Sequence, residues 1–332
     1  MTQITKEANR KNAKSKAMLL VLNNKALILL MLVFLISTFV TNYNTVTVYN
    51  LTSLMRQLSV YTIVAAGYTI IFAAGMMDLS VGEVLSLCGV IYAVISLSYP
   101  VWVAILACFV VGVFCEFLNG FMIRFFKIPG FVLTLAIAQI YKGISHLITD
   151  GRNVSGLSDL TKVFGQGRIF NFIPNAFLIA VIVILMLAIL ISRTIYGRHV
   201  LATGGNGEAA NVSGIKVEIL RVSAYMVAGI CASVGAIVLT GRVGFASATA
   251  GNSYTMDCIA AVVIGGTSMR GGKAKVVGTL FGVALIVVIN NMLNLLNVST
   301  YWQWIAKGFI IILAIVLDAL TEQFVNKQRA KA

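Results

Sequence analysis

Long apolar runs broken by short polar segments occupy most of this 332-residue chain. A helix of about 20 apolar residues is long enough to cross the hydrocarbon core of a bilayer. Counting one crossing for each such run predicts about ten transmembrane helices, of which the eighth is the least well defined. The expected spans are residues 19–41, 54–74, 81–98, 101–123, 131–149, 174–192, 221–240, 256–270, 276–296 and 301–320.

These spans divide the chain into a single membrane domain with a short tail at each end. The N-terminal tail is basic and covers residues 1–18, the membrane domain covers 19–320, and the C-terminal tail covers 321–332. An even number of crossings places both termini on the same side of the membrane. The expected fold class is an all-α polytopic membrane protein.

The distribution of Lys and Arg sets the expected orientation. With the N-terminus inside, 18 of the 25 Lys and Arg fall in cytoplasmic segments, and only Arg152, Lys162, Arg168 and Arg242 fall in external ones. Cytoplasmic loops carry an excess of positive residues. We therefore expect both termini to lie in the cytoplasm, where their basic residues face anionic lipid or a cytoplasmic partner.

The composition agrees with a membrane location and argues against several other classes of protein. Hydrophobic residues make up 59% of the chain and charged residues 11%, against about 45–50% and about 25% in soluble domains. The net charge of +14 does not indicate nucleic-acid binding, because no soluble domain is present to carry a basic face. The five cysteines lie in apolar runs without metal-type spacing and are interpreted as packing residues.

A polar loop at residues 193–221 separates two strongly apolar runs and contains residues that favour a short helix. Asn206 is suited to cap the start of that helix, Glu208 falls in its first turn, and Gly214 supplies its stop. The expected helix has about eight residues. Because so short a helix is marginal alone in water, we expect another protein or the membrane surface to receive it.

Two glycine-bounded corners, Gly75 to Gly82 and Gly271 to Gly278, interrupt apolar helices at the same spacing. An internal repeat would explain this spacing, but with 29 glycines in the chain chance is the favoured explanation. In the first corner, Ser80 and Glu83 have the spacing of a capping box that would begin the next span. The alternative is functional, because a carboxylate such as Asp78 between membrane helices is costly unless it is hydrated, paired or useful.

Other polar residues lie within or between the apolar runs. Amides in membrane helices commonly form helix-to-helix hydrogen bonds, whereas amides and hydroxyls that line a path would recognise a neutral polar solute. The glycine-rich segment 242–255 is expected to dip back into the protein as a candidate outer gate. The candidate residues of a translocation pathway are Asp78, Ser80, Asn119, Thr134, Gln139, Asn290, Asn291 and Asn294.

The chain contains no recognisable catalytic or nucleotide-binding motif. A phosphate-binding loop ends in Gly-Lys-Ser or Gly-Lys-Thr, and Gly272-Lys273 is followed by Ala274. No His-Glu-x-x-His motif is present, and the chain has two histidines. We therefore expect a non-enzymatic subunit without a cofactor of its own, so that any ATP-Mg used in transport would be bound by another subunit.

Several motifs together resemble the permease subunits of ABC importers for ribose, xylose, arabinose and galactose, a group related to branched-chain amino-acid permeases. The resemblance spans residues 55–320 and is carried by Gly75-Met-Met-Asp-Leu-Ser-Val-Gly82, Lys127-Ile-Pro-Gly-Phe-Val-Leu-Thr-Leu135, Gly204-Gly-Asn-Gly-Glu-Ala-Ala210, Asp257-Cys-Ile-Ala-Ala-Val-Val-Ile-Gly-Gly-Thr-Ser268 and Asn290-Asn-Met-Leu-Asn294. Met76 and Met77 depart from the usual Gly-Gly-Ile-Asp-Leu-Ser-Val-Gly corner, and Gly207 is an extra residue in the third motif, Gly204 to Ala210, where it shifts the register of the expected helix by one.

This resemblance implies a type II-like importer permease in a bacterial inner membrane, working with a cytoplasmic ATPase, an extracytoplasmic solute-binding protein and a second permease copy. It implies transport of a neutral monosaccharide or polyol. The alternative is a secondary transporter or channel that works alone. The residues that the resemblance assigns to ATPase coupling are Gly204, Gly205, Asn206, Glu208, Ala209, Ala210, Ser213 and Gly214.

Overall fold

The structure is a computed structural model, and it describes residues 25–169 and 172–309 together with positions 312 and 316. Both expected tails, 1–18 and 321–332, and parts of the first and last expected spans lie outside the described residues. In chain order the elements are α2 (Lys25–Val40), η1 (Asn44–Val46), α3 (Val48–Ala73), α4 (Val81–Ser98), α5 (Val101–Phe126), α6 (Gly130–Thr149), α7 (Asp159–Gln166), β1 (Arg168–Ile169), β2 (Ile173–Pro174), α8 (Asn175–Arg193), α9 (Ile195–Gly205), α10 (Gly207–Val212), α11 (Val217–Val243), α12 (Tyr254–Ile264) and α13 (Val276–Leu295).

Within the described residues, seven helices are long and apolar enough to cross a membrane: α3, α4, α5, α6, α8, α11 and α13. The helices α2 and α12 are apolar but shorter, and residues 300–309, which include the start of the tenth expected span, are helical. Each apolar run predicted from the sequence therefore contains a helix. The run expected over 256–270 is reduced to 11 residues in α12, too few to cross a membrane alone.

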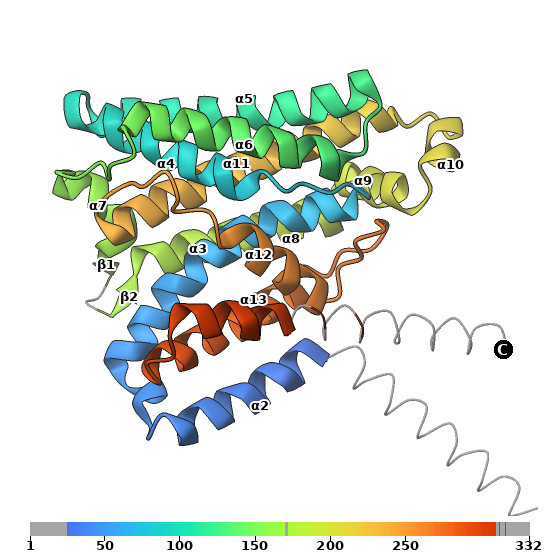
Figure 1. The fold of residues 1–332 in the computed structure, drawn as a ribbon. Helices are drawn as coiled ribbons and strands as arrows, with labels where there is room; N and C mark the ends of the chain where they lie inside the picture. The colour runs from blue at the N-terminus through green and yellow to red at the C-terminus, as the bar shows by residue number, and fades with distance from the viewer. Residues whose placement is uncertain (1–24, 170–171, 310–311, 313–315, 317–332) are drawn as a thin grey trace, which may run out of the picture.

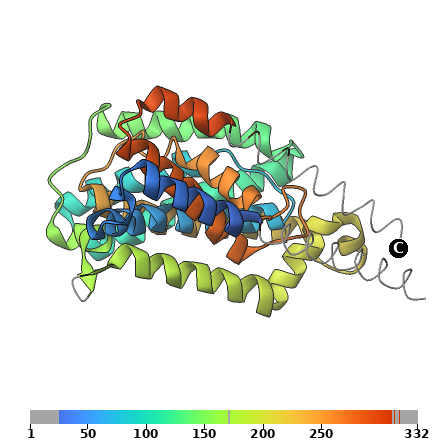
Figure 2. The same cartoon turned by 90° about the horizontal axis from the view of Figure 1, so that it is seen from below.

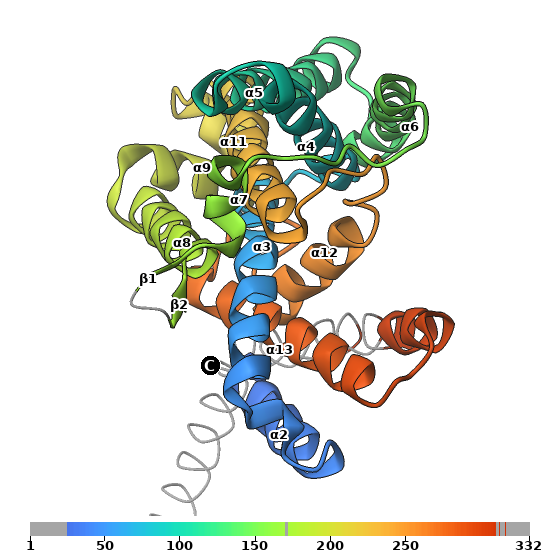
Figure 3. The ribbon, with the colours of Figure 1, turned by 90° about the vertical axis from the view of Figure 1, so that its left-hand side faces the viewer.

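The helices form a bundle around α3 and α11 (Figures 1 and 3). The apolar windows of α3 and α11 are 78% and 72% buried, whereas those of α5, α6 and α8 are 28% buried. Figure 3 shows α4 and α5 on one side of this centre and α2 and α13 on the other, with α6 and α8 at opposite flanks. The outer helices leave most of their apolar residues unburied, as is expected of helices that face lipid, while the central pair makes the contacts that hold the bundle together.

Small residues let α5 and α11 pack closely. Gly112 and Gly229 face each other so closely that a Cβ on Gly229 would overlap the carbonyl of Gly112. The Ser233 hydroxyl donates to the Cys108 carbonyl at 3.1 Å across the same interface. Close backbone approach through small residues is the usual basis of helix association in a membrane, where burial of apolar surface supplies little driving force.

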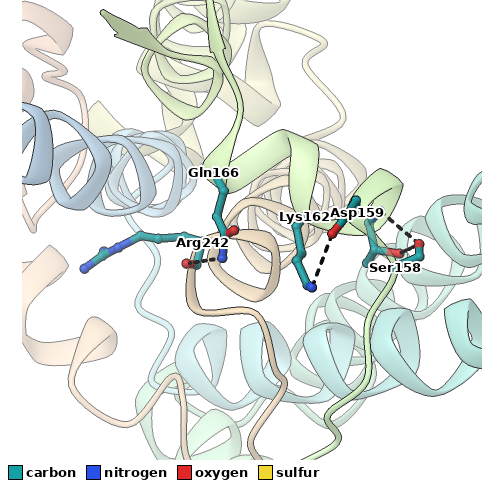
Figure 4. A network of polar contacts seen from close by, with 6 residues as sticks. Ser158, Asp159, Lys162, Gln166 and Arg242 are labelled. Atoms are coloured by element: carbon teal, nitrogen blue, oxygen red, sulfur yellow. Dashed lines mark hydrogen bonds and ion pairs between the residues drawn. The ribbon is translucent and has the colours of Figure 1, made fainter. Parts of the chain in front are cut away.

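The long segment after α6 folds over the end of α11 as a short helix and a two-stranded hairpin. Ser158 caps α7, and Lys162 lies 3.5 Å from Asp159 on its exposed side (Figure 4). The Gln166 amide donates to the Arg242 carbonyl at 3.3 Å, which fixes the end of α7 to the end of α11. Arg56 of α3 donates to the Gln166 carbonyl at 3.1 Å, so three elements meet at this end of the molecule.

Candidate functional site

The chain enters the bundle interior between α3 and α4. Asp78 and Ser80 are fully buried, and the backbone N–H and the hydroxyl of Ser80 donate to Asp78 Oδ1 at 2.6 and 2.7 Å. The capping box predicted from Ser80 and Glu83 is therefore wrong, because the Ser80 side chain makes no cap hydrogen bond. A buried carboxylate needs donors more than a helix end does, and the Gly82 amide of α4 instead donates to the Thr255 hydroxyl at 3.1 Å.

The carboxylate of Asp78 belongs to a larger polar cluster that includes a residue missed from the sequence. Glu116 of α5 is fully buried, and Asn119 donates both to its Oε2 at 3.1 Å and to the Ser80 hydroxyl at 2.8 Å. The Tyr141 hydroxyl of α6 donates to Asn119 Oδ1 at 3.1 Å. A lone glutamate in the apolar run 101–126 was the signal that could have identified Glu116.

Thr134 of α6 completes this site from the opposite side. Its hydroxyl accepts from the Leu79 backbone N–H at 2.9 Å and donates to the Gly130 carbonyl at 2.8 Å. The structure thus brings four predicted pathway residues together with one unpredicted residue. We call this group the α4 cluster, and its members are Asp78, Ser80, Glu116, Asn119 and Thr134.

A second buried polar group surrounds Asp257 at the start of α12, and we call it the α12 cluster: Tyr61, Asp257, Asn290 and Lys307. Asp257 Oδ2 accepts from the Lys307 ammonium at 2.8 Å and from the Tyr61 hydroxyl at 3.0 Å. Asn290 of α13 donates to the same oxygen at 3.4 Å. Of these residues, only Asn290 was predicted as a pathway residue. The signal that was missed is Asp257, a carboxylate near the start of the expected span 256–270.

The starts of α4 and α12 meet between the two clusters. The Gly251 amide donates to the Ser86 hydroxyl of α4 at 2.8 Å, and a Cβ on Gly82 would overlap the Gly251 carbonyl oxygen. The predicted return of segment 242–255 into the protein is confirmed, because Ala246, Ala248 and Gly251 are buried. Helix N-termini that meet inside a bundle direct their positive dipole ends at the same region, which favours an electronegative polar ligand there.

The remaining predicted pathway residues lie elsewhere. Asn291 exchanges two hydrogen bonds with Asn50 of α3, at 2.7 and 3.0 Å, and so joins two helices. Gln139 is exposed on α6. Asn294 is exposed near the end of α13, where its side-chain oxygen accepts from Gln303 at 2.9 Å. The structure therefore does not bring Gln139, Asn291 or Asn294 into either cluster.

The polar loop 193–221 forms two helices and not the single helix of eight residues that the sequence predicted. The first, α9, starts at a Thr194 cap, and the second, α10, has six residues. Asn206 caps α10 as predicted, since its side chain accepts from the Ala209 amide at 3.0 Å. Burial raises the pKa of the Tyr196 phenol, and its hydroxyl lies 3.0 Å from that of Ser223, which attaches α9 to α11.

Glycines connect this helical pair to the first corner. A Cβ on Gly204 would overlap the Ala73 carbonyl oxygen, and a Cβ on Gly271 would lie 2.7 Å from the Cα atoms of both Gly204 and Gly75. The Gly272 amide donates to the same Ala73 carbonyl at 3.1 Å. The two glycine-bounded corners of the sequence therefore meet at the end of α9.

The exposed face beside α10 is hollowed and charged. A recess of about 450 Å³ is lined by Asn206, Glu208, Asn211 and the residues Glu218 and Arg221 at the start of α11. The Arg221 guanidinium lies 3.0 Å from the Glu218 carboxylate at its edge. In the part of the chain that the structure describes, no group of three or more His, Cys, Asp or Glu residues could hold a metal ion, and all five cysteines are buried and free.

Comparison with known proteins places these features in a family. Residues 50–315 match the family described as branched-chain amino acid transport system / permease component. The chain is 38% identical over 273 residues to the ribose import permease protein RbsC of Bacillus subtilis strain 168, covering 81% of this chain and 84% of that protein.

Two further relatives extend the comparison. The chain is 35% identical over 290 residues to the galactose/methyl galactoside import permease protein MglC of Haemophilus influenzae, covering 82% of this chain and 86% of that protein. It is 28% identical over 360 residues to the xylose transport system permease protein XylH of Escherichia coli K12, covering 90% of this chain and 91% of that protein. No solved structure is significantly similar to the chain. The extent of the family match shows that this multi-pass membrane protein belongs to the family of branched-chain amino acid transport system permease components.

Proposed function

We propose that the chain is the membrane-spanning subunit of an ATP-driven ABC importer that takes up a neutral monosaccharide. The observation that carries this proposal is the 38% identity over 81% of the chain to a ribose import permease. Relatives named for galactose and xylose import extend the proposed substrate class from ribose to pentoses and hexoses in general.

The chemistry of the interior supports an uncharged, hydroxyl-rich solute. The α4 cluster and the α12 cluster offer carboxylate, amide and hydroxyl groups on either side of the junction between α4 and α12. These groups accept and donate hydrogen bonds to hydroxyls, and a site that hydrogen-bonds hydroxyls discriminates strongly against analogues that lack them. Asp78, Ser80, Asn119, Thr134 and Asn290 are the proposed pathway residues that fit this arrangement.

The geometry also supports a route for the energy of ATP hydrolysis. In this proposal α10 docks on a cytoplasmic ATPase subunit that binds ATP-Mg, and α9 passes its displacement to the Asp78 corner through Gly204. The proposed contact residues are Gly204, Gly205, Asn206, Glu208, Ala209, Ala210, Ser213 and Gly214.

The other partners follow from the same assignment. An extracytoplasmic binding protein would deliver the sugar at the end formed by α7 and α11, where the positive charges of Arg168 and Arg242 lie near that of Arg56. Such a concentration of positive charge favours a partner with an acidic surface. A second copy of the chain would complete the pathway, with both termini cytoplasmic in a bacterial inner membrane.

The proposal is tested by ATP hydrolysis in the assembled complex. The chain is purified with its ATPase in a nanodisc, and hydrolysis is measured with binding protein that is empty or loaded with ribose, galactose or xylose. We expect one of these loaded forms to raise the hydrolysis rate several-fold above the empty form. Failure of every sugar-loaded form to change the rate, with active ATPase present, would contradict the assignment to sugar import.

A further inference from the structure

Helix α6 carries a row of polar side chains that belongs to neither polar cluster. Gln139, Lys142 and His146 follow one another at intervals of three and four residues, so they lie on one face of the helix. Gln139 is exposed, and Lys142 and His146 are half-buried. The row lies between the buried side of α6, which carries Tyr141, and an apolar side on which Ile140 is 59% exposed. We call these three residues the α6 stripe.

The charged members of the α6 stripe face a carboxylate on α4. Helices α4 and α6 pack against each other, and the charged groups that act on the Glu83 carboxyl are Lys142 and His146. Glu83 is half-buried in the first turn of α4. Its Oε2 atom is buried and has no hydrogen-bond partner among the described residues. The two helices thus place an acceptor beside two nitrogen groups, an arrangement that can bind hydroxyls from both sides.

These groups lie farther along the bundle than the α4 cluster. The Thr134 hydroxyl of that cluster accepts from the Leu79 N–H, and Lys142 lies eight residues beyond Thr134, roughly 12 Å toward the end of α6 that leads to α7. Side chains on a helix lean toward its N-terminus. The Lys142 chain therefore leans back toward the level of Glu83, and not toward the headgroups beyond the far end of α6.

Charged groups at this depth cannot face hydrocarbon without a large cost. Both α4 and α6 are long and apolar enough to cross a membrane, and charged side chains in such helices face the bundle interior or a water-filled cavity. Figures 2 and 3 show α6 on the same side of the molecule as the helix of residues 300–309, opposite to α8. That helix carries Lys307 of the α12 cluster. The α6 stripe and the α12 cluster therefore lie toward one side of the bundle.

We propose that Glu83 and the α6 stripe line a water-filled outer part of the solute path, where they hydrogen-bond the hydroxyls of a neutral sugar before it reaches the α4 cluster. The Glu83 carboxylate would accept from sugar hydroxyls, while Lys142 and the Gln139 amide would donate to them. This inference rests on the proposed function, because it names further residues that the transported solute would contact.

Accessibility to water tests the inference without any measurement of transport. Gln139→Cys and Ile140→Cys are made separately in the full-length chain, which is assembled with its ATPase in nanodiscs. Each complex is treated with a water-soluble methanethiosulfonate reagent, and the five native cysteines give little background because all are buried. A thiol reacts as its thiolate, which forms in water and not in hydrocarbon, so Gln139→Cys should react at least about 10-fold faster than Ile140→Cys.

The charge beside the thiol supplies a second measurement. The ratio of the rates with an anionic and a cationic reagent depends on the local potential. In the Gln139→Cys chain, Lys142→Met should lower this ratio several-fold, whereas Lys142→Arg should preserve it. An unchanged ratio in Lys142→Met would place the ammonium away from the path and contradict its assigned role.

Contact with the solute is tested by protection. Sugar-loaded binding protein together with ATP should slow the labelling of Gln139→Cys several-fold relative to empty binding protein with ATP. Equal labelling in the two conditions would contradict the assignment of this face to the solute path.

Two further outcomes would overturn the inference. Equally slow labelling of Gln139→Cys and Ile140→Cys would assign the α6 stripe to lipid. A disulfide between the Gln139→Cys residues of two permease copies, with no labelling, would assign it to a dry interface between them. If sugar still stimulates ATP hydrolysis in such a complex, this inference fails and the proposed function stands.

Discussion

A carboxylate inside an apolar bundle must take its hydrogen-bond donors from the surrounding protein. Asp78 takes two of them from Ser80, and Asn119 links that hydroxyl to Glu116. Asp78 and Glu116 are both fully buried, and their carboxyl groups interact with each other. We propose this pair of carboxyl groups as the candidate for direct contact with a hydroxylated solute.

Replacement of Asp78 by alanine tests this assignment. The change leaves the Ser80 hydroxyl without its acceptor and should cost about 1–3 kcal/mol of stability. We expect sugar uptake by each folded complex to be lost as well, measured in proteoliposomes after correction for the amount of folded protein. Asp150→Ala, at an exposed position after α6, is the control. If each folded Asp78→Ala complex takes up sugar at the normal rate, Asp78 contributes to local structure and is not required for transport.

Gly204 provides a second test at a single residue. A Cβ at this position would overlap the Ala73 carbonyl oxygen, whereas a Cβ on the neighbouring Gly205 would meet only Gly272 Cα at 3.7 Å. Gly204→Ala should therefore separate α9 from the first corner and uncouple ATP hydrolysis from uptake, while Gly205→Ala should behave like the unaltered chain. Measuring both rates in the same preparation gives the ratio of sugar moved to ATP consumed. Equal ratios in the two variants would exclude this contact as the coupling route.

The residues of the site were only partly predictable from the sequence. Asp78, Ser80, Asn119 and Asn290 were identified because polar residues in apolar runs are conspicuous. Their partners were not, because Asn119 reaches Ser80 across 39 positions and Lys307 reaches Asp257 across 50. Hydrogen bonds between distant segments depend on how helices pack, and this packing leaves no periodic signal along the chain.

Among the elements, α10 is a helix of six residues in which Ala210 is the buried residue. Glu208 and Ala209 are exposed, so substitutions there should preserve folding. We expect Glu208→Lys to reverse the charge met by the ATPase and Ala209→Trp to obstruct its approach. Each should lower sugar-stimulated ATP hydrolysis at least several-fold without changing membrane insertion.

Val212 supplies the control for these changes. It is 90% exposed at the end of the same helix, and Val212→Thr alters neither charge nor size to any extent. Uptake as fast in Glu208→Lys and Ala209→Trp as in Val212→Thr would remove α10 from the proposed ATPase interface.

The helix at residues 300–309 is joined to α12 by the ion pair of Lys307 and Asp257, whose side chains are 17% and 4% exposed. Lys307→Met should leave the Asp257 carboxylate buried without its cation. Loss of one partner of a buried pair costs about 3 kcal/mol, which thermal unfolding would detect.

A second substitution separates the effect of the unpaired Asp257 charge from the effect of the altered side chain at position 307. Asp257→Asn added to Lys307→Met removes the unpaired charge, and we expect it to restore most of the lost stability. If the double variant is no more stable than Lys307→Met, the pair does not hold α12 in place.

Element limits were predicted well where a helix is apolar from end to end. The expected span 81–98 has the same limits as α4, and 174–192 differs from α8 by one residue at each end. The break between α9 and α10 was missed, because the sequence suggested only the Asn206 cap and gave no sign that residues 195–205 form a helix before it. Helix propensity is weak in a segment that contains four glycines within 197–207, and packing against α3 and α11 decides the outcome.

For the whole molecule, the described structure joins a polar interior to an exposed helical pair through backbone contacts between glycines. The interior carries groups that hydrogen-bond hydroxyls, and a charged recess lies beside the exposed helical pair. In the proposed function a permease component needs both features, a path for the solute and a contact surface for the subunit that supplies the energy.

The most direct test of this account is uptake of labelled sugar by proteoliposomes that contain the chain, its ATPase and its binding protein. The account predicts that sugar accumulates against its gradient only when ATP is supplied on the side of α10 and binding protein on the side of α7. An ATPase partner whose nucleotide site has been inactivated should abolish this accumulation. Uptake by the chain alone, independent of ATP or driven by a proton gradient, would contradict it and assign the chain to secondary transport.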